Sequence, residues 1–170
     1  MTTRPDSTEH APYFAKYISL VPDGEIIATL GKQIESTLGL LRGLSEAQGD
    51  LRYAPGKWSV KEVIGHLIDT ERIFAYRAMR FARNDRTPLP GFDENSFVAN
   101  ADFGARSLSD LIEEFECVRE SSLYLFKHLD DEAWSRRGVA NENEISVRAL
   151  AWNTAGHELH HLGILRSRYL

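Results

Sequence analysis

The sequence predicts an all-α fold: a four-helix bundle with a long crossover connection between its second and third helices. Three observations support this prediction. Apolar side chains recur every three or four residues in four long segments, no segment shows a sustained strand alternation between hairpin turns, and residues 85–106 are rich in Pro, Gly, Asp and Asn. At 170 residues, the chain has the size of one domain spanning 1–170.

The first two helices are predicted at about 24–45 and from Ser59 to about Arg83. The first segment places one apolar stripe on a helical face: Ile27, Leu30, Ile34, Leu38, Leu41 and Leu44. The second opens with Ser59 and Glu62 at the spacing of a capping box, in which the two side chains satisfy free backbone donors at a helix start. The short link between these helices favours antiparallel neighbours.

The third helix is predicted at about 107–129, and the fourth begins at Ser146, a suitable N-cap. The connection 85–106 is much longer than an ordinary bundle turn. It either crosses the bundle and lets the second and third helices run parallel, or forms a lid over a site. Residues 1–22 carry enough aromatic surface to form an N-terminal extension that packs on the bundle.

Composition narrows the classes of function. The chain has a net charge of −5, which argues against a broad nucleic-acid interface, and it has no apolar run of membrane-spanning length. It lacks a recognisable export signal, and a lone Cys117, interpreted as structural, fits a reducing compartment. We therefore expect a soluble cytoplasmic protein.

Two histidines occupy the predicted core stripe of the fourth helix. His157 and His161 are four residues apart and therefore share a face, and His66 lies on the apolar side of the second helix. If these two helices are antiparallel, the three imidazoles lie at compatible depths. Neutral imidazoles are good ligands for zinc, nickel or iron, so the pattern predicts a metal site. A core histidine bonded to a backbone carbonyl is the alternative for His66.

The other histidines are assigned different roles. His160 is a competing ligand, but it falls toward the edge of the stripe and is left outside the ligand set. His10 and His128 lie in the terminal segment and at a helix end, where surface roles are expected.

The segments SVKEVIGHLIDTERIFAYR and NTAGHELHHLGILR resemble the DinB-like superfamily, which includes YfiT-type metal-dependent hydrolases and bacillithiol transferases. The resemblance covers most of the chain. It implies a four-helix bundle, often a homodimer, that binds one divalent metal ion through His66, His157 and His161. Zinc or nickel is the expected ion, with iron or manganese as alternatives.

Three functions follow from this resemblance. The favoured one is transfer of a low-molecular-weight thiol, similar to bacillithiol, to an electrophilic small molecule. The alternatives are a metal-dependent hydrolase that activates water, and a non-catalytic stress-response protein that binds metal or a ligand. Three imidazoles would leave a coordination position open, which is typical of a catalytic site.

Several polar residues are candidates for supporting roles. Asp69 and Glu71 are proposed to orient a histidine or act as a base, and Asn153, one turn before His157, is expected to line the pocket. Asp93 and Glu94 are candidates for a lid. Four aromatic residues are expected either to be exposed at a dimer interface or to line the substrate cavity: Tyr76, Phe81, Phe92 and Phe97.

Overall fold

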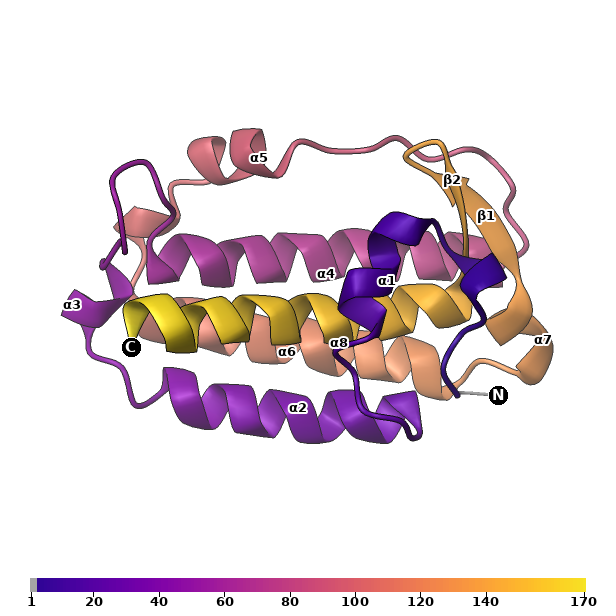
Figure 1. Cartoon of the computed structure of the whole chain (residues 1–170), viewed down its shortest axis with the longest axis horizontal. Helices are drawn as coiled ribbons and strands as arrows, with labels where there is room; N and C mark the ends of the chain where they lie inside the picture. The colour runs from indigo at the N-terminus through magenta and orange to yellow at the C-terminus, as the bar shows by residue number, and fades with distance from the viewer. Residues whose placement is uncertain (1–2) are drawn as a thin grey trace.

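The computed structural model describes residues 3–170 and has a frame of four long helices. These are α2 (Ile26–Leu41), α4 (Val60–Ala82), α6 (Leu108–Lys127) and α8 (Val147–Ile164) (Figure 1). The predicted all-α four-helix bundle is therefore confirmed. No helix among the described residues is both long and apolar enough to cross a membrane.

Side-chain caps fix the starts of three of these helices. At α4, the Glu62 backbone N–H donates to Ser59 Oγ, and the Ser59 backbone N–H donates to Glu62 Oε2, which is the predicted capping box. Ser107 and Ser146 accept backbone hydrogen bonds in the same way at the starts of α6 and α8. The serines seen in the sequence therefore set where the bundle helices begin.

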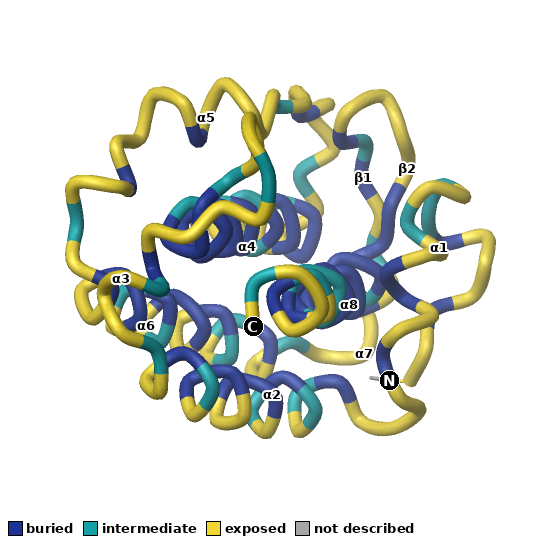
Figure 2. The backbone as a smooth tube through the Cα atoms, turned by 60° about the vertical axis from the view of Figure 1, so that its left-hand side comes forward, coloured by how far each residue is buried: buried dark blue, intermediate teal, exposed yellow. Residues whose placement is uncertain are grey.

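The order of the helices around the bundle differs from the sequence prediction. Both α2 and α4 pack on α6 and α8, and they lie diagonally opposite each other (Figure 2). The first two helices run antiparallel as expected (Figure 1), but the expectation that they are neighbours was wrong. The reason is that the link 42–59 contains a further short helix, α3 (Glu46–Gly49), and is long enough to reach the diagonal position.

The long connection between α4 and α6 crosses the length of the bundle, so that these two helices run parallel (Figure 1). It contains α5 (Glu94–Asn100) and the 3-10 turn η2 (Phe103–Ala105). Its far end is fixed where the ring of Phe103 packs on Gly65, at a position 2.4 Å from where a β-carbon would lie. The predicted crossover is confirmed, and α8 runs antiparallel to α4.

A small hairpin precedes α8 and was not predicted. Strands β1 (Arg137–Ala140) and β2 (Asn143–Ser146) pair antiparallel, and the crossover joins them where the Leu89 N–H donates to the Val139 carbonyl at 2.9 Å. The turn residues Asn141 and Glu142 both have positive φ, as a two-residue hairpin turn requires. Each strand has four residues, too few for an alternation to stand out. After α6, a short helix α7 (Asp131–Ser135) leads into this hairpin.

The N-terminal segment lies along α8. Residues 1 and 2 of the predicted extension 1–22 lie outside the described part of the chain. Helix α1 (Pro12–Ile18) packs closely on α8 at Gly156, where a β-carbon would lie 2.1 Å from the carbonyl oxygen of Tyr17. A glycine is therefore required for the backbone of α1 to approach α8 this closely.

A buried carboxylate fixes the segment that precedes α1. Glu9, in the 3-10 turn η1 (Ser7–Glu9), accepts hydrogen bonds from Ser146 Oγ at 2.7 Å and from the guanidinium of Arg148. Burial alone would raise the pKa of Glu9, but these hydrogen bonds and one from the Asp6 backbone outweigh it and lower the pKa. The start of the chain is thus tied to the start of α8.

Two further expectations are corrected by burial. Phe81 is fully buried, because it packs on Gly138 of the hairpin, and it is not available to an interface. Cys117 is exposed and has no structural role in the core. Tyr76 and Phe97 are exposed as expected, whereas Phe92 is half-buried.

Candidate metal centre

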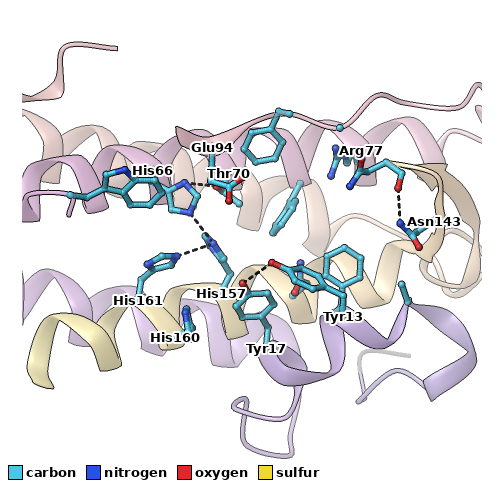
Figure 3. A pocket seen from close by; sticks show the side chains of 18 residues that line it. Tyr13, Tyr17, His66, Thr70, Arg77, Glu94, Asn143, His157, His160 and His161 are labelled. Atoms are coloured by element: carbon cyan, nitrogen blue, oxygen red, sulfur yellow. Dashed lines mark hydrogen bonds between the residues drawn. The ribbon is translucent and has the colours of Figure 1, made fainter. Parts of the chain in front are cut away.

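Three histidine side chains from α4 and α8 converge between these two helices (Figure 3). The Nε2 atom of His157 lies 3.1 Å from Nε2 of His66 and 3.1 Å from Nε2 of His161. One nitrogen from each ring lies within 4.8 Å of the other two. The structure therefore brings together the three residues that the sequence proposed as ligands.

The antiparallel packing of α4 and α8 places these side chains level with one another. His157 and His161 are one turn apart on α8, so their rings share a face. The phenol of Tyr169, beyond the end of α8, donates a 2.5 Å hydrogen bond to the carbonyl of Trp58, just before α4. This contact joins the two helices near the histidines and fixes their stagger.

All three imidazoles are held in the neutral form. Burial lowers the pKa of His66 to about 4. Burial, and then the neighbouring His66 and His160, lowers the pKa of His161 to about 3, and burial lowers the pKa of His157 well below its ordinary value. Neutral imidazoles have free lone pairs, which metal binding requires.

The spacing of the nitrogens fits a metal ion. Ligand nitrogens at about 2.05 Å from a tetrahedral zinc ion lie about 3.3 Å apart. The two Nε2–Nε2 distances of 3.1 Å are close to this value. The cluster therefore indicates a site for a metal ion with three nitrogen ligands.

Aromatic rings surround the three histidines. The Trp58 ring lies 4.8 Å from the His66 ring, and the rings of Tyr17 and Phe74 lie 5.5 and 6.0 Å from that of His157. Thr70 Oγ1 lies 3.4 Å from Nδ1 of His66, on the side away from the other histidines. These contacts restrict the orientation of the imidazoles and shield them from bulk water.

The histidines form one end of a cavity of about 360 Å³. This volume is in the range of small-molecule binding sites. Helices α1, α4 and α8, the crossover and the hairpin all contribute to its walls. The aromatic residues of its lining are Tyr13, Phe14, Tyr17, Trp58, Phe74 and Phe92. The crossover is therefore both a connection and a wall of the site.

The two carboxylates proposed as bases do not line this cavity. Asp69 is half-buried beside Arg72, and burial raises its pKa. Glu71 points into the bundle core, where both of its oxygens accept 2.8 Å hydrogen bonds from Arg119. Arg119 also donates to Glu158 at 2.7 Å. The interpretation of Glu71 as a base does not fit this geometry, because the carboxylate is held in an ion-pair network.

Asn153 and Glu94 do line the cavity, as expected for a pocket residue and a lid residue. Asp93 instead caps α5 by accepting hydrogen bonds from two backbone N–H groups. His160 also lies on the lining, half-buried, with its ring 5.3 Å from that of Tyr17. His128 is exposed, in keeping with the surface role expected of it.

Sequence reasoning missed several residues of the site. Arg77 lines the cavity, and Tyr17 and Trp58 pack on the histidines. Phe92 also lines the cavity, which is one of the two places expected for it. Arg77 lies on α4 eleven residues after His66, close to the same face of the helix, so helical spacing contained a signal for it. The others come from loops or from α1, whose positions depend on the tertiary fold.

Comparison with known proteins identifies the family. The model of the DinB superfamily matches residues 29–165. The chain belongs to the DinB superfamily. A protein of Oceanobacillus iheyensis named "Putative metal-dependent hydrolase" is 26% identical over 141 residues, which cover 79% of this chain and 80% of that protein.

A solved structure shares the fold of this DinB-superfamily chain. YfiT from Bacillus subtilis, described as "a probable metal-dependent hydrolase with an unusual four-helix bundle topology", matches with a TM-score of 0.67. The match covers 95% of this chain and 91% of YfiT at 16% sequence identity. At this identity the match supports the bundle architecture alone.

Proposed function

We propose that this protein is a divalent-metal-dependent hydrolase of a small molecule bound in the cavity beside the three histidines. The observation that carries the proposal is the convergence of three neutral imidazoles at one end of a cavity of about 360 Å³. The Oceanobacillus iheyensis protein similar to this chain is named "Putative metal-dependent hydrolase", which supports the same chemistry.

His66, His157 and His161 would hold the ion, for which the three nitrogen donors favour zinc or nickel over harder ions. When bound, such an ion supplies a Lewis acid that lowers the pKa of a nucleophile at its open coordination position. Trp58 and Tyr17 pack on the histidine rings and exclude bulk water from this end of the cavity. Glu94, on the crossover wall, is the one carboxylate of the described cavity lining and would be the proton acceptor for such a nucleophile.

Thiol transfer is the second candidate, and one observation favours it. Asp69 and Glu71 lie outside the cavity lining, and Glu94, the one carboxylate of the described lining, is exposed, so no buried carboxylate is available to activate water. A low-molecular-weight thiol becomes a strong nucleophile at neutral pH once it is deprotonated, and it then needs no further base. The aromatic lining would accommodate both the thiol and an electrophile.

Metal content provides the first test. The protein is purified without a histidine tag, and its metal content is measured by elemental analysis for the wild type, His161→Ala and His160→Ala. We expect about one divalent ion per chain in the wild type and in His160→Ala, and a loss of at least about tenfold in affinity in His161→Ala. Equal metal content in all three proteins, with unchanged helical circular dichroism, would overturn the proposed ligand set.

Activity assays separate the candidate functions. Hydrolysis of a panel of esters and amides, and consumption of an electrophile, are measured with and without an added low-molecular-weight thiol. Hydrolysis that is lost on metal removal and does not depend on the thiol supports the proposal. Turnover that requires the thiol supports transfer instead. Stoichiometric metal without turnover in either assay supports a non-catalytic binding protein.

A further inference from the structure

A buried arginine on the cavity wall has no carboxylate partner. The Arg77 residue is 6% exposed, and its guanidinium donates one 2.8 Å hydrogen bond, to the carbonyl of Pro90. No ion pair joins it to a carboxylate anywhere in residues 3–170. The other deeply buried arginine, Arg119, is paired with both Glu71 and Glu158. Because Arg77 lines the cavity and makes this one hydrogen bond, its guanidinium has further donors with which it could bind a ligand there.

A second polar side chain in the same cavity also lacks partners. Asn153 is fully buried, and neither its Oδ1 nor its Nδ2 makes a hydrogen bond within the described structure. Leaving a buried amide without hydrogen-bond partners is costly. Both Arg77 and Asn153 line the cavity.

Asn153 and Arg77 lie one after the other along the cavity, at increasing distance from the histidines. Asn153 is one turn before His157 on α8, about 6 Å along the helix axis, and Arg77 is eleven residues after His66 on α4, about 16 Å along its axis. Side chains lean toward the N-terminus of their own helix. Because α4 and α8 are antiparallel, the side chains of Arg77 and Asn153 lean toward each other.

We propose that Arg77 and Asn153 form a binding subsite for an acylated amino acid or similar molecule, with Arg77 binding its free carboxylate and Asn153 pairing with its amide group. As the substrate class for the reaction at the histidines, this assignment rests on the proposed function. The guanidinium fork matches a carboxylate. The Asn153 amide has one donor side and one acceptor side, which match the carbonyl and the N–H of an amide.

The remaining charges around the cavity fit an anionic ligand. Glu94 is the only carboxylate among the described lining residues, and it is exposed, so solvent screens its charge. Burial lowers the pKa of Arg77, which reflects the missing counter-charge. The aromatic lining suits the apolar acyl group of such a ligand.

The test compares three small probes that have nearly the same length. N-benzoylglycine carries both the amide and the carboxylate, N-benzoylglycinamide lacks the carboxylate, and 4-phenylbutanoate lacks the amide. Binding to the full-length protein, as purified and after chelation of metal, is measured by calorimetry or NMR. The variants are Arg77→Met, Asn153→Leu and, as a control, Arg72→Met, which removes the same charge from an exposed position of α4.

We expect the wild type to bind N-benzoylglycine about tenfold more tightly than either other probe. Arg77→Met should no longer prefer N-benzoylglycine over N-benzoylglycinamide, because the carboxylate has lost its partner. Asn153→Leu should no longer prefer N-benzoylglycine over 4-phenylbutanoate. Arg72→Met should retain both preferences. Equal binding of the three probes by the wild type would overturn the proposal. This comparison uses only the wild-type protein, so it does not depend on whether the variants fold. A carboxylate preference that disappears on chelation but survives in Arg77→Met would also overturn it, because the carboxylate would then bind the metal.

Failure of this test and failure of the proposed function are distinguishable. A protein that binds metal and hydrolyses a substrate but shows no probe preference lacks only the subsite. A protein that prefers N-benzoylglycine but retains no metal has the subsite without the proposed chemistry.

Discussion

Replacing Arg119 with methionine should strongly destabilise the protein. Arg119 is fully buried and donates two 2.8 Å hydrogen bonds to Glu71, one of 2.7 Å to Glu158 and one of 3.2 Å to the carbonyl of Leu30. Arg119→Met leaves two buried carboxylates without a counter-charge. Breaking a buried ion pair in this way costs about 3–5 kcal/mol. For a chain of this size the melting temperature should fall by about 6–20 °C.

Urea unfolding followed by circular dichroism measures this loss, and a triple variant tests its cause. If uncompensated charge is responsible, Arg119→Met combined with Glu71→Gln and Glu158→Gln should be more stable than Arg119→Met alone, although it carries two more substitutions. Glu158 accepts from Thr37 on Oε1 and from Gln33 on Oε2, and glutamine at position 158 retains one acceptor oxygen for the Thr37 hydroxyl. A single variant that loses less than about 1 kcal/mol, or a triple variant less stable than the single one, would refute the reasoning.

Two further predictions concern the N-terminal segment. Gly156→Ala should destabilise the protein by about 1–3 kcal/mol, because the new methyl group would collide with the backbone of Tyr17. Gly163→Ala, in open space on the same helix, should be neutral or stabilising in the same urea titration, so equal effects would contradict the packing argument. Glu9→Gln should destabilise at neutral pH. Since folding lowers the pKa of Glu9, its contribution is present above the ordinary value of 4.5 and is lost as pH falls through the folded value. The difference in unfolding free energy between wild type and Glu9→Gln should therefore become smaller as the pH is lowered. A difference that does not change with pH would contradict this assignment of the Glu9 carboxylate.

The sequence was most informative where local chemistry determines structure. Serine caps located the starts of α4 and α8, and helical periodicity placed His66, His157 and His161 on inward faces. Their convergence required only that α4 and α8 be antiparallel, and in the structure they are. Polar residues in an apolar stripe stand out because burying them without partners is costly.

Predictions failed where the answer depends on contacts between distant segments. The position of Glu71 in the helical repeat indicated only roughly which face of α4 its side chain occupies. Its partner Arg119 lies on α6 and could not be identified from the sequence of α4 alone. The short link after α2 limits how far α4 can lie from α2, but it does not determine whether the two helices are neighbours. The sequence therefore did not predict their diagonal arrangement. The burial of Phe81 depends on Gly138 in a hairpin whose two-residue turn, Asn-Glu, carries no glycine signal.

Helix α8 explains why the metal centre and the ionic core are so close together. Of residues 147–158, all except Arg148 are buried, so this helix is enclosed on nearly every side. Three consecutive residues contact three different partners: Gly156 packs on α1, His157 faces the histidine of α4, and Glu158 binds side chains of α2 and α6. Consecutive helical residues point about 100° apart, which makes this division possible. A single helix therefore positions the N-terminal segment, two of the three clustered histidines and one carboxylate of the core, and a shift of α8 would disturb all three.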